Sequence, residues 1–402
     1  MLVVAAPLLG HVLPLVPLAA ALRAAGNEVL VAAGDVADRV GGLPAHDLAP
    51  GYRLDRAALR VLATHPLVAR RELQGTAGTR GVGMLFGAVN AGLLGPVEEL
   101  VARWRPDVVV HEPLACAAAV AAARHDVPAV LQDNTLVDGV ALVTATVTAR
   151  PMVKAALRLG VTTVPAPALR LVTAPPSLVG PQPGQPLRPV PFAGDGPVPA
   201  GLERRGDRPR LLVSHSTVPG PGGNALRPVL AAVDGLDAEV VVLRAPEGPL
   251  PANVRPVGWV PLPALLPHAD AIVHHGGAGT VLAALAFGVP QLVIPGPGDR
   301  PRLLVSHSTV PGPGGNTLRP VLAALAFGVP QLVIPGPGDR RYNAELVARR
   351  GAGLAGAPSR ATITRLLADG GLRAAAAEVR AEVAAMPEPA EVAAAVLAGV
   401  RS

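Results

Sequence analysis

Apolar runs of strand length alternate with helix-like segments at the start of the chain. Residues 2–6 form an apolar run that ends at Pro7, residues 12–25 carry apolar positions at helical spacing before Gly26, and residues 28–33 form the next apolar run. This pattern predicts a strand, a helix and a second strand. A βαβ unit requires a parallel sheet, and such sheets bind their ligands at the carboxyl ends of the strands.

The same alternation continues along the chain and divides it into two parts. In the first part it predicts a helix at 90–103, a strand at 107–110, and further elements at 114–124, 129–132 and 137–159. Proline and glycine then become dense over residues 175–209, as in an interdomain linker. New strands are expected at 210–213, 239–243 and 271–273. We therefore predict an N-terminal domain at 1–197, a linker at 198–208 and a C-terminal domain at 209–402.

One glycine-rich stretch stands between a predicted strand and a predicted helix. It reads His274-His275-Gly276-Gly277-Ala278-Gly279-Thr280. The first N–H groups of a helix are unpaired and carry partial positive charge, so a phosphate can approach the backbone there. The stretch has neither the lysine of a P-loop nor the glycine spacing of a dinucleotide fingerprint. It therefore indicates an anion site, and a tight turn with a satisfied histidine is the alternative.

Composition narrows the function classes. Of the 402 residues, 50% are hydrophobic and 2% aromatic, and the net charge is +6. The arginines are scattered and form no basic run interleaved with aromatics, so we expect no nucleic-acid partner. A single cysteine, Cys116, excludes an internal disulfide and fits a reducing cytosol. The uncharged start before Arg23 contains proline and lacks a basic segment, so we predict a soluble, cytoplasmic chain with no signal peptide and no membrane span.

Two long segments of the chain occur twice. Residues 281–300 recur unchanged at 321–340, and residues 206–232 recur at 298–324 with one difference, Ala225 against Thr317. The copies are too exact and too irregularly placed for a solenoid array. Removing residues 301–340 would join Arg300 directly to Arg341. We interpret the repeat as an apparent duplicated insert, which bulges out, enlarges the sheet or displaces the first copy.

Several short motifs occur in an order typical of one enzyme family. They are Gly10-His11-Val12-Leu13-Pro14, Trp259-Val260-Pro261-Leu262, the stretch from His275 to Thr280, Gly288-Val289-Pro290, Asp299 and Tyr342-Asn343-Ala344. Together they resemble the nucleotide-sugar signature of family 1 glycosyltransferases, especially the actinobacterial natural-product branch. The resemblance covers most of the chain. It implies an α/β fold of the GT-B type, with two facing Rossmann-like domains built on parallel sheets.

The resemblance also implies two catalytic residues. His11 follows the first predicted strand and matches the family's general base, which takes the proton from the acceptor hydroxyl. Glu112 follows the strand at 107–110 and matches the carboxylate that orients this base. A histidine that caps the first helix and a carboxylate that only caps a loop are the alternatives.

The implied donor site lies mainly in the C-terminal domain. The resemblance assigns the diphosphate to the glycine stretch and the nucleotide base to the tryptophan motif, and two acidic positions compete for the sugar. The Gln that follows the acidic residue in the family is arginine in both copies, which leaves the choice of sugar open. The implied donor-binding residues are Thr217, Trp259, Val260, His275, Gly277, Ala278, Gly279, Thr280, Asp299 with Arg300 or Asp339 with Arg340, and Asn343.

The resemblance thus implies inverting transfer of a sugar or deoxysugar from a TDP- or UDP-sugar to a hydroxyl of a hydrophobic natural-product aglycone. The nucleotide-sugar is a co-substrate, and we expect no cofactor, no metal, and a monomer or weak homodimer. Two alternatives are a nucleotide-sugar epimerase of similar fold and a catalytically inactive nucleotide-sugar binder or accessory subunit. The products separate the three cases: a glycoside, an epimerised donor, or neither despite donor binding.

Overall fold

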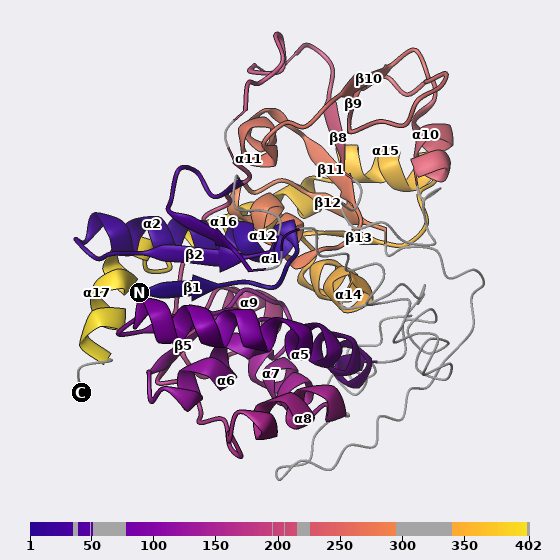
Figure 1. Cartoon of the computed structure of the whole chain (residues 1–402). Coiled ribbons are helices and arrows are strands. Elements are labelled where there is room, and N and C mark those ends of the chain that lie inside the picture. The colour runs from indigo at the N-terminus through magenta and orange to yellow at the C-terminus, as the bar shows by residue number, and fades with distance from the viewer. Residues whose placement is uncertain are drawn as a thin grey trace.

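The structure is a computed structural model that describes residues 1–34, 39–48, 50, 78–194, 196–204, 206–214, 226–294 and 340–399. Its strands form two separate sheets, with seven strands in the first and six in the second. Neighbouring strands within each sheet run parallel, for example β1 with β2 and β8 with β11. The predicted α/β fold with two parallel sheets is confirmed (Figure 1).

The first sheet has the strand order β3-β2-β1-β4-β5-β6-β7, so the first strand of the chain lies inside it. Its strands are β1 (Leu2–Val4), β2 (Leu30–Ala33), β3 (Ala45–Asp47), β4 (Val109–His111), β5 (Ala129–Asp133), β6 (Leu169–Val172) and β7 (Gln185–Pro186). The helices between them are α1 (Leu9–Val12), a 3-10 turn (Leu13–Leu15), α2 (Val16–Ala24), α5 (Gly78–Trp104), α6 (Cys116–Arg124), α7 (Gly139–Val147), α8 (Arg150–Arg158) and α9 (Pro176–Val179).

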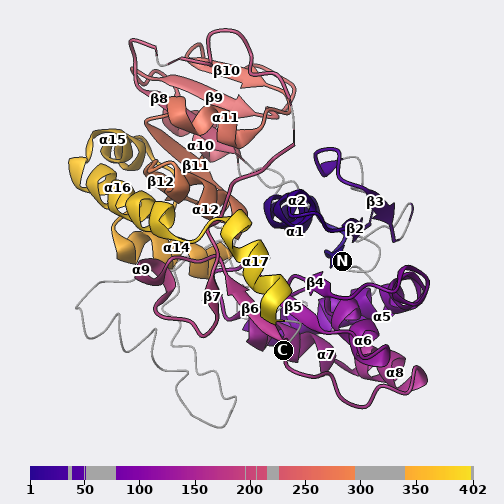
Figure 2. The ribbon, with the colours of Figure 1, turned by 90° about the vertical axis from the view of Figure 1, so that its left-hand side faces the viewer.

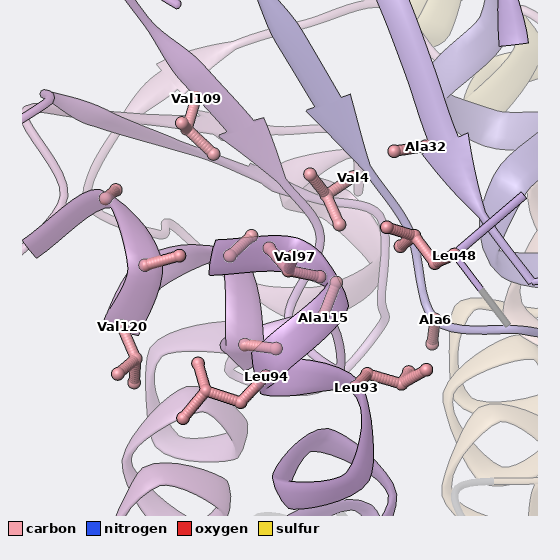
Figure 3. Packing of buried hydrophobic residues seen from close by; sticks show 14 of the residues in the cluster. Val4, Ala6, Ala32, Leu48, Leu93, Leu94, Val97, Val109, Ala115 and Val120 are labelled. Atoms are coloured by element: carbon pink, nitrogen blue, oxygen red, sulfur yellow. The ribbon is translucent and has the colours of Figure 1, made fainter. Parts of the chain in front are cut away.

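Both faces of the first sheet are buried in apolar cores. Side chains alternate between the two faces of a strand, so Leu2 and Val4 of β1 pack under α5 and α6 (Figure 3), whereas Val3 packs on the other face. Burial on both faces explains why β1 is apolar at every position and shows no polar alternation.

Helix α5 is longer than the sequence indicated. The predicted helix covered 90–103, and the structure begins it at Gly78. Gly83 and Gly87 let it approach α7 and the start of α8 closely, because an added Cβ would lie 2.6 Å from the carbonyl oxygen of Ala145 in α7 and 2.4 Å from the Cβ of Ala149, the N-cap of α8. Glycine is a poor helix former, and here the two glycines are the residues that let α5 pack against its neighbours.

Helix α5 is also long and apolar enough to cross a membrane by length and composition alone. Half of the most apolar stretch of α5 is buried inside the molecule, however, and the helix contacts α6, α7 and α8. Core helices of globular domains commonly meet the same criteria, because a helix buried on several sides is apolar nearly all round.

The second sheet has the strand order β10-β9-β8-β11-β12-β13. Its strands are β8 (Arg210–Ser214), β9 (Glu239–Leu243), β10 (Val254–Val257), β11 (Ala271–His274), β12 (Gln291–Val293) and β13 (Gly353–Ala355). Its helices are α10 (Leu226–Val233), α11 (Leu262–Leu265), a 3-10 turn (Leu266–His268), α12 (Ala278–Ala286), α14 (Arg340–Arg350), α15 (Arg360–Ala368), α16 (Gly370–Ala385) and α17 (Pro389–Gly399).

The duplicated segment interrupts this second sheet in sequence but not in its strand order. Strand β12 belongs to the first copy of the repeat, and it pairs with β11 on one side and β13 on the other. Helix α14 begins at Arg340, the last residue of the second copy. The three arrangements expected for the insert all concern residues 295–339, and these lie outside the described residues.

The last helix packs on the first sheet rather than the second. Helix α17 lies within the predicted second domain in sequence, but it contacts α2, and Val392, Ala393 and Val396 are buried in the core around that helix. Arg188, beyond β7, donates to the carbonyl oxygen of Met386 at 2.9 Å, just before α17. The chain therefore crosses back to the first sheet at its end (Figure 2).

Candidate active site

His11 and Glu112 lie together at the carboxyl ends of two paired strands. His11 is on α1, which follows β1, and Glu112 directly follows β4. The Nδ1 atom of His11 is 3.1 Å from Oε2 of Glu112. The His11 side chain is 24% exposed, whereas that of Glu112 is fully buried. One ring nitrogen thus contacts a buried carboxylate while the ring keeps access to solvent.

Three donors surround the Glu112 carboxylate. The backbone N–H of Ala6 donates to Oε1 at 3.0 Å, and that of Leu114 donates to Oε2 at 2.8 Å. Burial by itself would raise the pKa of Glu112, but His11 and these two backbone groups outweigh it and lower the pKa. The carboxylate is therefore ionised and only accepts, so Nδ1 of His11 is the donor, and whenever the ring is neutral its lone pair is on Nε2.

Neighbouring side chains hold the histidine in place. The ring of Phe86 on α5 lies 6.1 Å from that of His11, centroid to centroid. On β5, Nε2 of Gln132 donates at 2.8 Å to the carbonyl oxygen of Pro14, one turn after His11. His111 is buried, which lowers its pKa, and its Nδ1 donates to the carbonyl oxygen of Glu112. Phe86 and Gln132 were not among the predicted site residues, and an apolar helix and a strand-end glutamine carry no distinctive sequence signal.

The glycine stretch forms the predicted turn between β11 and α12. Gly276 has φ +86°, and an added Cβ would lie 2.7 Å from Val293 and 2.9 Å from the carbonyl oxygen of Arg340, so only glycine fits there. The N–H of Gly276 donates to Nδ1 of His274, and Nε2 of His274 lies 2.7 Å from Oε1 of Gln291. Burial lowers the pKa of His274 to about 4, so this histidine is a neutral, structural residue.

The N-terminus of α12 carries backbone N–H groups that the described residues leave unpaired. Gly277 is its N-cap and provides no side-chain hydrogen bond. Within the described part of the chain, no hydrogen bond is formed by the backbone N–H groups of Ala278 and Gly279, and Gly279 is exposed. Thr280 is partly exposed in the first turn. Unpaired N–H groups at a helix N-terminus are an anion site.

His275 lies beside this N-terminus in a positively charged environment. Burial lowers its pKa to about 3, and the charges of Arg340 and Arg244 contribute in the same direction. An added Cβ on Gly277 would lie 2.7 Å from Nε2 of His275, so the glycine makes room for the ring. The buried Nδ1 of His275 has no hydrogen-bond partner in the described residues. An anion bound here would offset the repulsion among these groups.

Asn343 supports the turn from behind. It is fully buried on α14 and donates from Nδ2 to the carbonyl oxygen of Gly276 at 2.8 Å. The resemblance implied a donor contact for Asn343, and in the structure its Nδ2 fixes the glycine turn. Arg340, three residues earlier on the same helix, lies beside that turn.

The predicted wall for the nucleotide base is only partly accessible. Trp259 is 39% exposed, and the guanidinium carbons of Arg39 and Arg244 lie 5.5 and 5.9 Å from its ring centroid. Val260 is buried among apolar residues of the second sheet's core, so its side chain supports the wall from within. Thr217, Asp299, Arg300 and Asp339 lie outside the described residues.

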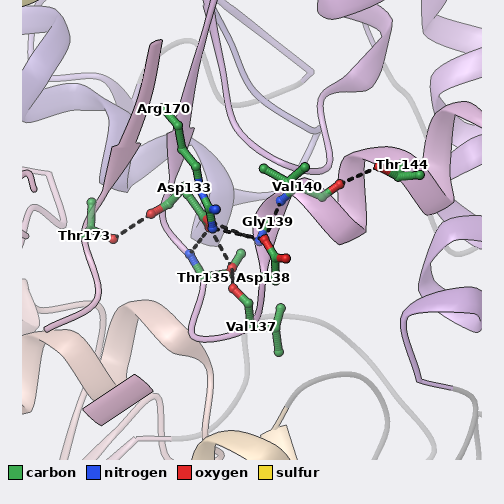
Figure 4. A network of polar contacts seen from close by, with 9 residues as sticks. All are labelled: Asp133, Thr135, Val137, Asp138, Gly139, Val140, Thr144, Arg170 and Thr173. Atoms are coloured by element: carbon green, nitrogen blue, oxygen red, sulfur yellow. Dashed lines mark hydrogen bonds and ion pairs between the residues drawn. The ribbon is translucent and has the colours of Figure 1, made fainter. Parts of the chain in front are cut away.

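A polar network fixes the loop that leaves β5. Asp133 accepts from Thr135, from the N–H of Gly139 and from Arg170, whose Nη2 lies 2.7 Å from Oδ2 (Figure 4). Leu136, in the middle of this loop, packs in one cluster with Val281 and Leu285 of α12 and with Ala344 of α14. The network thus holds the first sheet's loop against helix α12, which begins at the glycine turn. Within the described ranges, no three His, Cys, Asp or Glu side chains are grouped as a metal site.

Comparison with known sequences supports this organisation. The N-terminal domain model of the erythromycin biosynthesis protein CIII-like family matches residues 20–216, and its C-terminal domain model matches twice, at 227–314 and 303–398. The double match follows the internal repeat. The elloramycin glycosyltransferase ElmGT of Streptomyces olivaceus is 36% identical over 98% of this chain and 95% of its own. The TDP-daunosamine transferase DnrS of Streptomyces peucetius is 32% identical over 71% of this chain and 77% of its own.

Solved structures of glycosyltransferases are similar to this chain over nearly its whole length. The glycosyltransferase SnogD of Streptomyces nogalater has a TM-score of 0.74 and 33% identity, and the match covers 99% of this chain and 98% of that one. The Streptomyces glycosyltransferase SsfS6, solved with thymidine diphosphate, has a TM-score of 0.75 and 25% identity over 99% of both chains. The chain therefore belongs to the erythromycin biosynthesis protein CIII-like family, the actinobacterial natural-product branch of the family 1 glycosyltransferases with the GT-B fold.

Proposed function

We propose that this chain transfers a deoxysugar from a thymidine or uridine diphosphate donor to a hydroxyl of a hydrophobic natural-product aglycone, with inversion at the anomeric carbon. The relatives with elloramycin and daunosamine in their names support the acceptor and sugar classes. The similar structure that holds thymidine diphosphate supports the donor class.

The contact between His11 and Glu112 is the observation that carries the proposal. Because Nδ1 of His11 donates to the ionised carboxylate, the lone pair on Nε2 can accept the proton of the acceptor hydroxyl. The hydroxyl oxygen then forms a bond to the anomeric carbon on the face opposite the diphosphate, which is the inverting geometry. The imidazolium that results is stabilised by the negative charge of Glu112.

The leaving group departs toward the second sheet. As the bond from the anomeric carbon to the diphosphate oxygen breaks, its electron pair stays on the diphosphate. The N–H groups of Ala278 and Gly279, the hydroxyl of Thr280 and a ring N–H of His275 would stabilise this charge. These groups and the nearby arginines can take the charge that a metal ion would take, and we propose that the enzyme uses no metal and no cofactor.

The aglycone would bind on the first sheet's side. Phe86 lies beside His11, and the partly buried Leu85 is its neighbour on α5, so the base faces an apolar helix. An apolar surface next to a general base suits a hydrophobic acceptor with one reactive hydroxyl. We further propose that the enzyme acts in the cytoplasm as a monomer or weak homodimer.

Glycoside formation tests the proposal. The chain is incubated with TDP- and UDP-sugars and a panel of polyketide aglycones, and products are identified by mass spectrometry. We expect a glycoside, and a loss of about 10²–10⁴-fold in kcat/KM for His11→Ala, since general base catalysis has this magnitude. A glycoside that forms equally fast with His11→Ala would refute the assignment of the base.

A second candidate is a nucleotide-sugar-binding protein without transferase activity. The repeat favours it, because a segment of 40 residues (301–340) separates the two halves of the family's sugar-binding motif. This candidate predicts donor binding without glycoside formation, and restored transfer in a chain that lacks residues 301–340.

A further inference from the structure

Arg244 occupies an unusual position in the second sheet. It directly follows β9 at the carboxyl edge of the sheet, with φ +52°. Its backbone N–H donates to the carbonyl oxygen of Val257 at 2.7 Å. Left-handed conformations are uncommon for residues other than glycine and cluster at functional sites, so this observation directs attention to the side chain.

The side chain lies between the two parts of the donor site. Its guanidinium carbon is 5.9 Å from the ring centroid of Trp259, the proposed wall for the base. Along the same edge, β8 separates β9 from β11, which carries the glycine turn. Strands lie about 4.8 Å apart, so the ends of β9 and β11 are about 10 Å apart, a gap that an arginine and a diphosphate together can span.

The electrostatic effect of Arg244 on His275 also indicates that its side chain lies between Trp259 and the glycine turn. The charge of Arg244 is one of the causes that lower the pKa of His275, whereas Arg39 is not among them. Both arginines contact the ring of Trp259. Of the two, only Arg244 also has an electrostatic effect on His275, at the proposed diphosphate site. Arg39 belongs to the first sheet's half of the chain and follows β2.

We propose that Arg244 is a donor-binding residue whose guanidinium moves from the ring of Trp259 to the diphosphate when the nucleotide base stacks on that ring. The inference rests on the proposed function and assigns one more residue to its donor site. An arginine suits this place because its planar donors match two phosphate oxygens at once. The exchange would also clear one side of Trp259 for the base.

The pair of arginines provides a matched test. Calorimetry measures the affinity of the full chain for TDP and for thymidine in wild type, Arg244→Ala, Arg244→Lys and Arg39→Ala, with the exposed Arg158→Ala as control. We expect Arg244→Ala to weaken TDP binding at least tenfold and thymidine binding less than threefold, and Arg244→Lys to lie between it and wild type. Arg39→Ala should change both affinities by the same factor, and Arg158→Ala neither.

The outcomes separate this inference from the proposed function. If the wild type binds neither TDP nor thymidine, the proposed function fails and this inference fails with it. If the wild type binds TDP and Arg244→Ala binds it equally well, only the role of Arg244 is refuted. Equal losses for TDP and thymidine in Arg244→Ala would also refute it, because they would show a contact with the base alone.

Discussion

Glu112→Gln separates the electrostatic role of the carboxylate from its shape. The substitution keeps the side-chain volume, removes the negative charge and replaces one acceptor oxygen by an NH₂ group. The glutamine amide can place its NH₂ group at either oxygen position. The position of Oε1, facing Ala6, costs less free energy, because one hydrogen bond is lost there, whereas Oε2 accepts from both Leu114 and His11. His11 then keeps its donor contact and its tautomer but loses the charge that stabilises the imidazolium.

The structure sets the size of both effects. One buried N–H, that of Ala6, is left without its acceptor, which costs about 1–3 kcal/mol in the free energy of unfolding. A hydrogen bond to a charged group is worth about 1.5–3 kcal/mol, so loss of the charge should lower kcat/KM by roughly 10–100-fold. This loss is smaller than that expected for His11→Ala, which removes the base itself.

Urea denaturation and steady-state kinetics measure the two effects separately. The pKa of Glu112 is lowered in the folded state, so its contribution to stability is present above the unfolded pKa of about 4.3 and is lost as the pH falls through the folded pKa. Glu112→Gln should therefore flatten the acid side of the stability curve. Unchanged kcat/KM in a folded Glu112→Gln enzyme would refute the reasoning, and so would a loss as large as that of His11→Ala.

Two further predictions concern the glycine turn. Gly277→Ala keeps an allowed backbone conformation (φ −62°) but places a Cβ 2.7 Å from Nε2 of His275, so it should turn the ring and weaken TDP binding about tenfold with little loss of stability. The control Gly370→Ala, whose Cβ meets no atom within 4 Å, should change neither quantity, and equal TDP affinities would contradict the role of His275. The lowered pKa of His274, about 4, means that the unfolded chain binds a proton below pH 6.5 before the folded chain does, so stability should fall by about 2 kcal/mol between pH 6.5 and 4.5. His274→Asn should flatten this slope in urea denaturation, and a slope equal to that of the wild type would contradict it.

Much of the fold follows from local patterns. The apolar runs predicted central strands of both sheets, β1, β2 and β4 in the first and β8, β9 and β11 in the second, because a strand buried on both faces is apolar throughout, as β1 is between its two cores. Short strands at the sheet edges, such as β3 and β10, were not predicted. The N-terminal half of α5 escaped prediction, since Gly83 and Gly87 weaken the helical signal and gain their meaning only from contact with α7. The packing of α17 on α2 depends on where the chain crosses between sheets, which no local pattern encodes.

Some features of the candidate site could likewise be predicted from the sequence, and others could not. Strand ends predicted that His11 and Glu112 lie at the same edge of the sheet, and resemblance supplied their roles. Direction and burial of side chains were not predictable: Val260 points into the core of the second sheet, and Asn343 is fully buried and bonded to the glycine turn. Arg244 has no sequence signal, because its backbone conformation and its contact with Trp259 arise only in the folded sheet.

The central claim is that the N-terminus of α12 and His275 bind the diphosphate of a sugar nucleotide. Calorimetry with TDP and UDP tests it on the full chain, on a chain lacking residues 301–340, and on His275→Ala in each. We predict that the shortened chain binds a nucleoside diphosphate and that His275→Ala weakens this binding at least tenfold. If the full chain binds as well, the repeat leaves the donor site intact. If neither chain binds either nucleotide, the assignment of the glycine turn as a diphosphate site is wrong.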